Sequence, residues 1–279
     1  MINTPYIINL APTGIVPKKD NTPLVPLSHN EIVDNILQCA EYGVQMFHIH
    51  ARDANQQHSN DPEQYGRIIE SIRKTTIGKQ LVLCVTASGR EDSSFESRSK
   101  VLELDGEMKP DMASLTLSSL NFINAASVNQ PTVIRQLAEK MKQNGIKPEI
   151  EVFDLGMLNF LKVLIKEGLV EQTPYVNLLF GNISSAQSTP LEMALLLNEL
   201  PSSCIKSIAG VGASQLKANS FGLLFADGVR VGLEDNIWFD ENRTTLATNL
   251  VLVKRIIDLG DIMQRPLLPV NSLRNKLFG

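Results

Sequence analysis

Eight short apolar runs alternate with stretches of helical periodicity along the chain. Strands that are separated by helices indicate βαβ units, which form parallel sheets. Eight such units in 279 residues predict one closed (β/α)8 barrel, a TIM barrel, that spans 1–279 as a single domain. An open doubly wound sheet is the alternative, although no GxGxxG follows the first run. The expected strands are Tyr6–Ala11, Met46–His50, Leu81–Thr86, Met112–Thr116, Glu149–Phe153, Tyr175–Phe180, Ile205–Ala209 and Val229–Leu233.

Helices are expected between these strands. The first is marked by a capping box, Ser28-x-x-Glu31, by apolar residues at helical spacing, and by Gly43 just beyond its end. The other expected helices cover Pro62–Lys74, Phe95–Leu104, Pro131–Asn144, Leu155–Lys166, Pro190–Leu200, Ala213–Ala226 and Ala247–Leu259.

Composition argues against several classes of protein. The net charge of -4 disfavours a nucleic-acid surface. No apolar run is long enough to span a membrane, and the N-terminal residues do not resemble a signal peptide. Three cysteines without a CxxC pair fit a reducing compartment, as small core residues. We therefore expect a cytoplasmic protein with no nucleic-acid or membrane partner.

Several expected strands carry polar residues on the face that should point into the barrel. Strand residues alternate between the interior and the helix layer, so apolar Phe47 and Ile49 place their histidine neighbours inward. Buried charges are costly unless they are paired or bound to metal. A polar interior near the mouth therefore predicts a functional site, and its six ionisable side chains are His48, His50, Glu149, Glu151, Arg230 and Glu234.

Three of these residues could hold a metal ion. His48 and His50 belong to the second strand and Glu234 follows the eighth, and both strands flank the first in a closed barrel. Two imidazoles and one carboxylate with an open position are typical of catalytic zinc, and the same set also suits Fe(II). An isolated HxH is otherwise typical of hydrogen-bonded core histidines. The sequence thus predicts a divalent metal, with zinc preferred.

Other polar residues have two open interpretations. Glu149 and Glu151 could pair with Arg230 as a structural network. Asp235 could be a turn cap, and the Arg52–Asp53 pair could be exposed or could orient the metal ligands. The hydroxyls and amides of 86–89 could bind an anion or simply form a turn.

The chain resembles the β-keto acid cleavage enzymes, whose founding activity cleaves 3-keto-5-aminohexanoate. The likeness covers nearly the whole chain, and the segments together are specific although each alone is not. They are INLAPTG (8–14), FHIHARD (47–53), KPEIEVFDLGM (147–157), AGVGASQ (209–215) and GVRVGLEDN (228–236).

The resemblance implies a zinc-dependent TIM barrel that exchanges acyl groups between a β-keto acid and acetyl-CoA, giving acetoacetate and a new acyl-CoA. It implies zinc ligation by His48, His50 and Glu234, with Asp235 as general base, Arg230 polarising that base, and Glu151 near the reacting centre. Zinc could chelate the ketone and carboxylate oxygens and stabilise the enolate that C–C cleavage releases. Substrate contacts are assigned to Thr86, where the family has a serine, to Ser88 as its possible substitute, and to Thr116.

One position departs from the family. Members that act on an amino-bearing substrate carry an acid near the end of the first strand, where this chain has Ile15. An apolar side chain cannot pair with an ammonium group, so a neutral or apolar substrate tail is expected. Arg90 could meet an anionic tail or a coenzyme A phosphate, but we interpret it as solvated.

Two rival functions stay open beside this one. A different metal-dependent enzyme on the same barrel, an aldolase or hydrolase, would need the same triad without acetyl-CoA. A non-catalytic binding barrel is the other rival, and a base beside three metal ligands weighs against it. We also expect a homo-oligomer, with the apolar segment Pro266–Val270 as a candidate contact between copies.

Overall fold

The computed structural model describes residues 4–279 and shows a closed barrel of parallel strands. Its order is β1-β10-β9-β8-β7-β4-β3-β2, so the second and eighth barrel strands flank the first as expected. The predicted TIM barrel is confirmed. The barrel strands are β1 (Ile7–Leu10), β2 (Met46–Ile49), β3 (Val82–Val85), β4 (Met112–Thr116), β7 (Lys147–Val152), β8 (Tyr175–Phe180), β9 (Ile205–Gly210) and β10 (Gly228–Val231).

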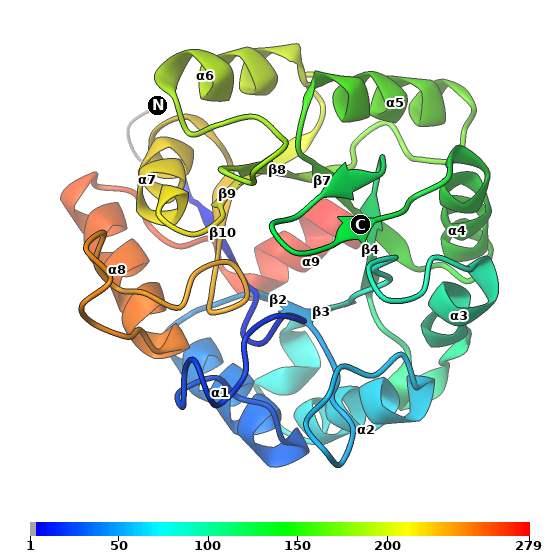
Figure 1. Ribbon diagram of the computed structural model, residues 1–279, viewed down its shortest axis with the longest axis horizontal. Coiled ribbons are helices and arrows are strands. Elements are labelled where there is room, and N and C mark those ends of the chain that lie inside the picture. Colours follow the sequence, from blue (N-terminus) through cyan, green and yellow to red (C-terminus); the bar gives the residue numbers. More distant parts are fainter. Residues whose placement is uncertain (1–3) are drawn as a thin grey trace.

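Eight helices surround the barrel, as the view along its axis shows (Figure 1). The capping box is present at the first of them, where the Ser28 side chain accepts from the Glu31 amide. The expected helix over 95–104 is shorter, because it ends at Ser99 and continues as a 3-10 turn over Lys100–Glu103. The surrounding helices are α1 (His29–Glu41), α2 (Pro62–Arg73), α3 (Phe95–Ser99), α4 (Pro131–Gln143), α5 (Leu155–Lys166), α6 (Pro190–Glu199), α7 (Ser214–Phe225) and α8 (Asn249–Ile262).

The strand alternation sorts the core into two layers. Outward residues such as Phe47, Ile49 and Val231 pack with the helices in one large apolar cluster. A second cluster fills the barrel floor and joins the first residues of the strands, including Ile7 and Met46. The interior is therefore apolar at the N-terminal ends of the strands and polar toward their C-terminal ends.

Two further elements were not foreseen. Helix α9 (Val270–Phe278) closes the floor, where Leu273 and Leu277 pack into the second cluster, and Figure 1 shows it behind the barrel. A small hairpin, β5 (Leu120–Asn121) with β6 (Ala126–Ser127), follows β4 at the mouth. Neither carries a long periodic pattern: α9 has nine residues and each hairpin strand has two.

The segment 266–270 packs within its own chain. Leu267 forms a bridge with Tyr6 and packs against the large cluster, and Leu268 packs on the floor cluster. Its apolar character therefore has an explanation inside the protomer, and the homo-oligomer stays a prediction. Across residues 4–279, none of the helices is both long and apolar enough to cross a bilayer.

Candidate metal centre and substrate cavity

The predicted metal ligands lie together at the mouth of the barrel. The Nε2 atoms of His48 and His50 are 3.2 Å apart, and Nε2 of His50 is 3.3 Å from Oε1 of Glu234. Nε2 of His48 is 3.8 Å from Oε2 of the same carboxylate, and all the candidate ligand atoms lie within 4.8 Å of one another. The alternation of β2 turns both rings inward, and β10, which lies on the other side of β1, brings Glu234 to them.

Gly14 allows the loop after β1 to pass close to this centre. Its φ is 70°, and a Cβ atom there would lie 2.6 Å from Cγ of Glu234. Only glycine combines that backbone conformation with such a close approach. The loop therefore presses on the Glu234 side chain and limits the positions that its carboxylate can take.

The donor set fits a divalent cation. Oε2 of Glu234 is buried and has no hydrogen-bond partner among the described residues. Burial lowers the pKa of His50 to about 3, so its ring is neutral, and burial of Glu234 is outweighed by His50 and Arg230, which hold its pKa well below the ordinary range. Neutral imidazole and ionised carboxylate are the forms that bind metals. Burial of His48 is outweighed by Glu149 and Glu234, which raise its pKa to about 9, so a cation would displace a proton from this ring. This structure thus provides the ligands of an open two-histidine, one-carboxylate site.

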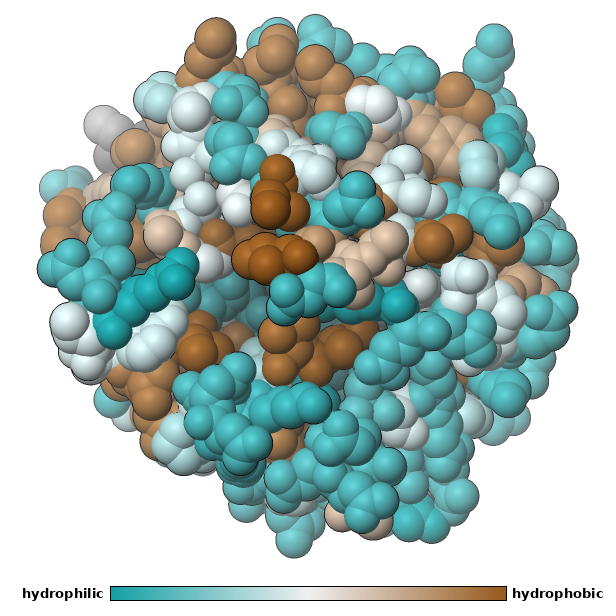
Figure 2. Space-filling model, viewed as in Figure 1, coloured by the Kyte–Doolittle hydropathy of each residue, from teal (hydrophilic) through white to brown (hydrophobic). Residues whose placement is uncertain are grey.

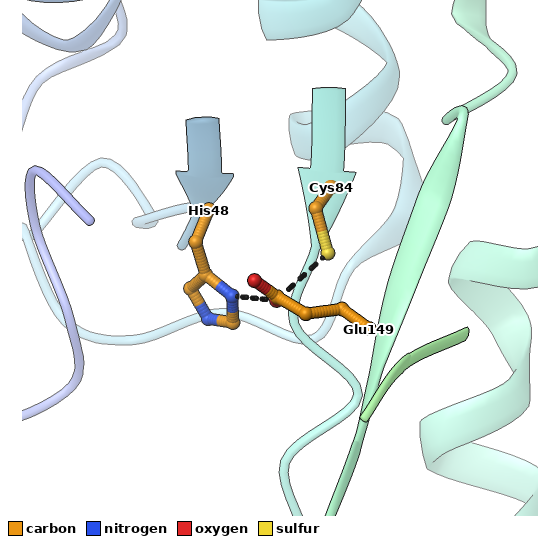
Figure 3. Close-up of side chains that lie close together, drawn as sticks. All are labelled: His48, Cys84 and Glu149. Carbon is orange, nitrogen blue, oxygen red and sulfur yellow. Dashed lines mark hydrogen bonds and ion pairs between the residues drawn. The ribbon is translucent and has the colours of Figure 1, made fainter. Parts of the chain in front are cut away.

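The ring of His48 is held from behind by Glu149 (Figure 3). Nδ1 of His48 lies 2.5 Å from Oε2 of this glutamate, which leaves Nε2 facing His50. The same carboxylate accepts from the Asn9 and Asn177 amides at 2.5 and 2.7 Å and from the Cys84 thiol at 3.0 Å. Every oxygen of the fully buried Glu149 is therefore hydrogen-bonded.

His48, Cys84 and Glu149 form a second cluster with metal-ligand spacing. Burial and the neighbouring Glu149 raise the pKa of the Cys84 thiol well above its ordinary value. A metal-binding cysteine is a thiolate, whereas this thiol stays protonated and donates to the carboxylate. We therefore interpret Cys84 and Glu149 as hydrogen-bonding partners that hold His48 in position for the site of His48, His50 and Glu234.

The pairing of Glu149 with Arg230 that the sequence suggested is wrong, since the ion pairs of Arg230 within the described chain involve three other acids. Its guanidinium holds Asp235 through two bonds of 3.1 Å, Glu151 at 3.0 Å and Glu234 at 2.8 Å. Arg230 is 2% exposed, so these contacts replace its hydration. Burial raises the pKa of Asp235 to about 6, although Arg230 opposes that shift.

All four predicted substrate contacts line one cavity of about 540 Å³ above this centre, which Figure 2 shows as a hollow in the mouth face. These residues are Ile15, Thr86, Ser88 and Thr116. Thr116 donates to Glu151 at 2.7 Å, and Thr86 accepts from the Ser88 amide at 3.2 Å. The structure gathers them in one place, and their contacts with substrate stay predictions.

Arg90, which we interpreted as solvated, is half-buried and packs on an aromatic ring. Its guanidinium carbon lies 3.7 Å from the centre of the Phe122 ring, and it lines the cavity. Arg52 was expected either to form an exposed pair with Asp53 or to orient the metal ligands. It instead donates to the carbonyls of Gly14, Ile15 and Pro17. Sequence periodicity could not show these contacts, since both arginines follow their strands in loops.

Comparison with known proteins agrees with the fold. The apo structure of ObcA superposes with a TM-score of 0.79 at 17% identity, covering 92% of this chain and 66% of that one, just under two thirds. A dihydrodipicolinate synthase superposes with a TM-score of 0.52 at 11% identity, covering 97% and 78%. At these identities the likeness concerns the barrel alone.

Two curated relatives match almost end to end. The "3-oxoadipate:acetyl-CoA acetyltransferase" of Cupriavidus necator is 32% identical over 274 residues, covering 97% of this chain and 93% of the relative. The "3-keto-5-aminohexanoate cleavage enzyme" of Acetoanaerobium sticklandii is 26% identical over 272 residues, covering 97% of both.

A closed parallel barrel with clustered histidines and acids at its mouth defines the class of the TIM-barrel enzymes. Residues 5–278 match the beta-keto acid cleavage enzyme family. The chain belongs to that family and is an enzyme that cleaves β-keto acids by acyl transfer.

Proposed function

We propose that this enzyme exchanges acyl groups between a β-keto acid and acetyl-CoA, with zinc held by His48, His50 and Glu234. The products are acetoacetate and the acyl-CoA of the remaining part of the β-keto acid. The observation that carries the proposal is that Arg230 binds both Asp235 and Glu234, so that a carboxylate lies close to a proposed zinc ligand. Acetyl-CoA is the co-substrate in the name of the relative that is 32% identical.

Asp235 is the proposed base. It removes a proton from the methylene between the ketone and the carboxylate, and this carbon then attacks the acetyl carbon of acetyl-CoA. The thiolate that leaves attacks the original ketone carbon, the bond between that carbon and the methylene carbon breaks, and the carbon that is released takes the proton back. Bonds and protons balance, so no oxidant or other co-reactant is needed.

The surrounding residues prepare Asp235 for this step. Arg230 holds the carboxylate by two hydrogen bonds and keeps its orientation fixed, and Glu151 and Thr116 complete the hydrogen-bond chain. Burial raises the pKa of Asp235 to about 6, which makes it a stronger base than an exposed aspartate. A zinc ion would supply Lewis acidity that polarises the ketone and stabilises enolate charge.

The expected neutral or apolar tail rested on Ile15. This residue lines the cavity, which supports a tail without an ammonium group. Arg90 also lines the cavity, where its guanidinium packs on the Phe122 ring, so the same cavity holds a cation. The surroundings of Arg90 in the cavity therefore determine which tail charge the enzyme accepts.

The test is to incubate the enzyme with acetyl-CoA labelled with ¹³C in the acetyl group and with a panel of β-keto acids. Acyl exchange puts the label into acetoacetate and produces one acyl-CoA for each β-keto acid consumed. An aldolase or hydrolase would consume a substrate without acetyl-CoA and leave the label in place. A passive binding barrel would consume nothing, and either result would refute the proposal.

A further inference from the structure

Arg90 is a cation that faces the cavity without a counter-ion. Its Nε atom is buried and has no hydrogen-bond partner among residues 4–279, and its guanidinium contributes to no ion pair there. The acids of the same cavity are Glu151, Glu234 and Asp235, and all three pair with Arg230 instead. The charge of Arg90 is therefore available to whatever enters the cavity.

The wall behind Arg90 keeps its guanidinium in place. The group stacks on the Phe122 ring at 3.7 Å, and that ring lies perpendicular to the Phe153 ring, with centroids 6.1 Å apart. A cation on an aromatic face keeps its N–H groups free at the edge of the plane. This edge can bind a carboxylate through two parallel hydrogen bonds, which is the arrangement that arginine favours.

A second arginine lies behind the same turn. Arg98 is 2% exposed and donates through Nε to the Ala87 carbonyl at 2.7 Å, while Nη1 and Nη2 have no partner among the described residues. A Cβ atom at Gly89 would lie 2.9 Å from Nη1, so the turn passes directly over this guanidinium. Two arginines without counter-ions make this wall attractive to an anion.

The cavity that contains Arg90 and the metal ligands is lined in large part by apolar side chains, among them Ile15, Leu120, Leu179 and Leu233. A ligand with an apolar middle and a charged end next to Arg90 matches this lining. Coenzyme phosphates have a better partner in Arg243, which also lines the cavity but is exposed.

We infer that Arg90 binds a second carboxylate at the far end of the β-keto acid, so that the substrates are dicarboxylic β-keto acids with a short methylene chain. The inference rests on the proposed function for the position of the keto acid end at the metal ligands. It agrees with the 3-oxoadipate in the name of one relative.

The test compares two six-carbon substrates, 3-oxoadipate with a terminal carboxylate and 3-oxohexanoate with a terminal methyl group. The wild-type enzyme is expected to favour 3-oxoadipate in kcat/KM by about 100-fold, as for a charge-assisted hydrogen bond. Arg90→Gln is expected to abolish most of that preference without changing the KM for acetyl-CoA. Arg135→Gln is the matched control, because Arg135 also stacks on a phenylalanine, Phe160, but pairs with Glu167 on the surface.

Two results would overturn the inference. One is a wild-type enzyme that does not favour the dicarboxylate. The other is an Arg90→Gln variant that loses both substrates equally or raises the KM for acetyl-CoA, which would assign Arg90 to the keto acid end or to the coenzyme.

Calorimetry separates this inference from the proposed function, because binding needs no turnover. Adipate is expected to bind wild-type enzyme at least about 10-fold more tightly than hexanoate, and Arg90→Gln to remove the difference. Equal binding of the two acids would refute the role of Arg90 even in an active enzyme. If adipate binds as expected but neither keto acid reacts, the proposed reaction fails and the carboxylate site stands.

Discussion

Nδ1 of His48 lies 2.5 Å from the carboxylate of Glu149, and Nε2 of the same ring faces His50 and Glu234. The two nitrogens of this imidazole therefore have different partners: Nδ1 bonds Glu149, and Nε2 is available to a metal ion. A carboxylate behind a metal-binding histidine selects the tautomer and increases the basicity of the free nitrogen. Burial opposes protonation of this ring, yet Glu149 and Glu234 raise the pKa of His48 to about 9, so a cation must displace a proton.

Glu149→Gln is expected to weaken zinc binding by about 10- to 100-fold, because the amide keeps the shape of the side chain but removes the charge behind His48. Zinc affinity is measured by competition with a chelator, with thermal unfolding as a check of folding. Glu171→Gln is the control, since Glu171 pairs with Lys147 of the same strand, away from the metal ligands. An unchanged affinity would show that Glu149 has a structural role only.

His50→Ala is expected to remove most of the bound metal, because it deletes one of the three ligands. His58→Ala is the matched control: its ring centroid lies 5.5 Å from that of His50, but its Nε2 bonds Asn60 and it does not belong to the cluster. Elemental analysis of the purified proteins gives the metal content. Equal amounts of metal in the two variants would eliminate the proposed site.

Asp235→Asn is expected to lower kcat by about 100- to 10,000-fold, because the amide keeps a hydrogen bond to Arg230 but cannot accept the proton. Metal content and melting temperature should change little. Asp240→Asn makes the same substitution in a surface turn, where Asp240 accepts from the Thr244 and Thr245 amides. Activity that falls equally in both variants would argue against Asp235 as the base.

Glu31 links stability to pH at the start of α1. Partial burial opposes ionisation, but hydrogen bonds from Lys19, Ser28 and Leu27 lower the pKa of Glu31 to about 2 from 4.5. A lowered folded-state pKa contributes stability that is present above the ordinary value and is lost as the pH falls toward the folded value.

Glu31→Gln is therefore expected to lower the melting temperature at pH 6 and to differ less from wild type as the pH falls from about 4.5 toward 2. Thermal unfolding at several pH values measures this difference. A difference that is the same at pH 6 and at pH 3 would mean that the charge of Glu31 does not contribute.

Strand alternation was sufficient to predict which side chains share the barrel interior. Because side chains of a strand point alternately to its two faces, His48 and His50 had to face the same way. Closure of eight strands then placed Glu234 next to them. Local rules also predicted the capping box at Ser28, since its two hydrogen bonds join residues three apart.

Tertiary structure alone decided which polar groups are partners. Glu149 bonds His48 and Cys84 instead of Arg230, because the strand register sets the reach of each side chain. Arg90 meets Phe122 through the packing of two loops, whose conformation no periodicity predicts. Helix α9 can bury its apolar side chains only when the barrel floor has formed. The sequence by itself therefore determined the barrel and the direction of its inner side chains, whereas hydrogen-bond partners and loop contacts depended on distances that only the folded chain defines.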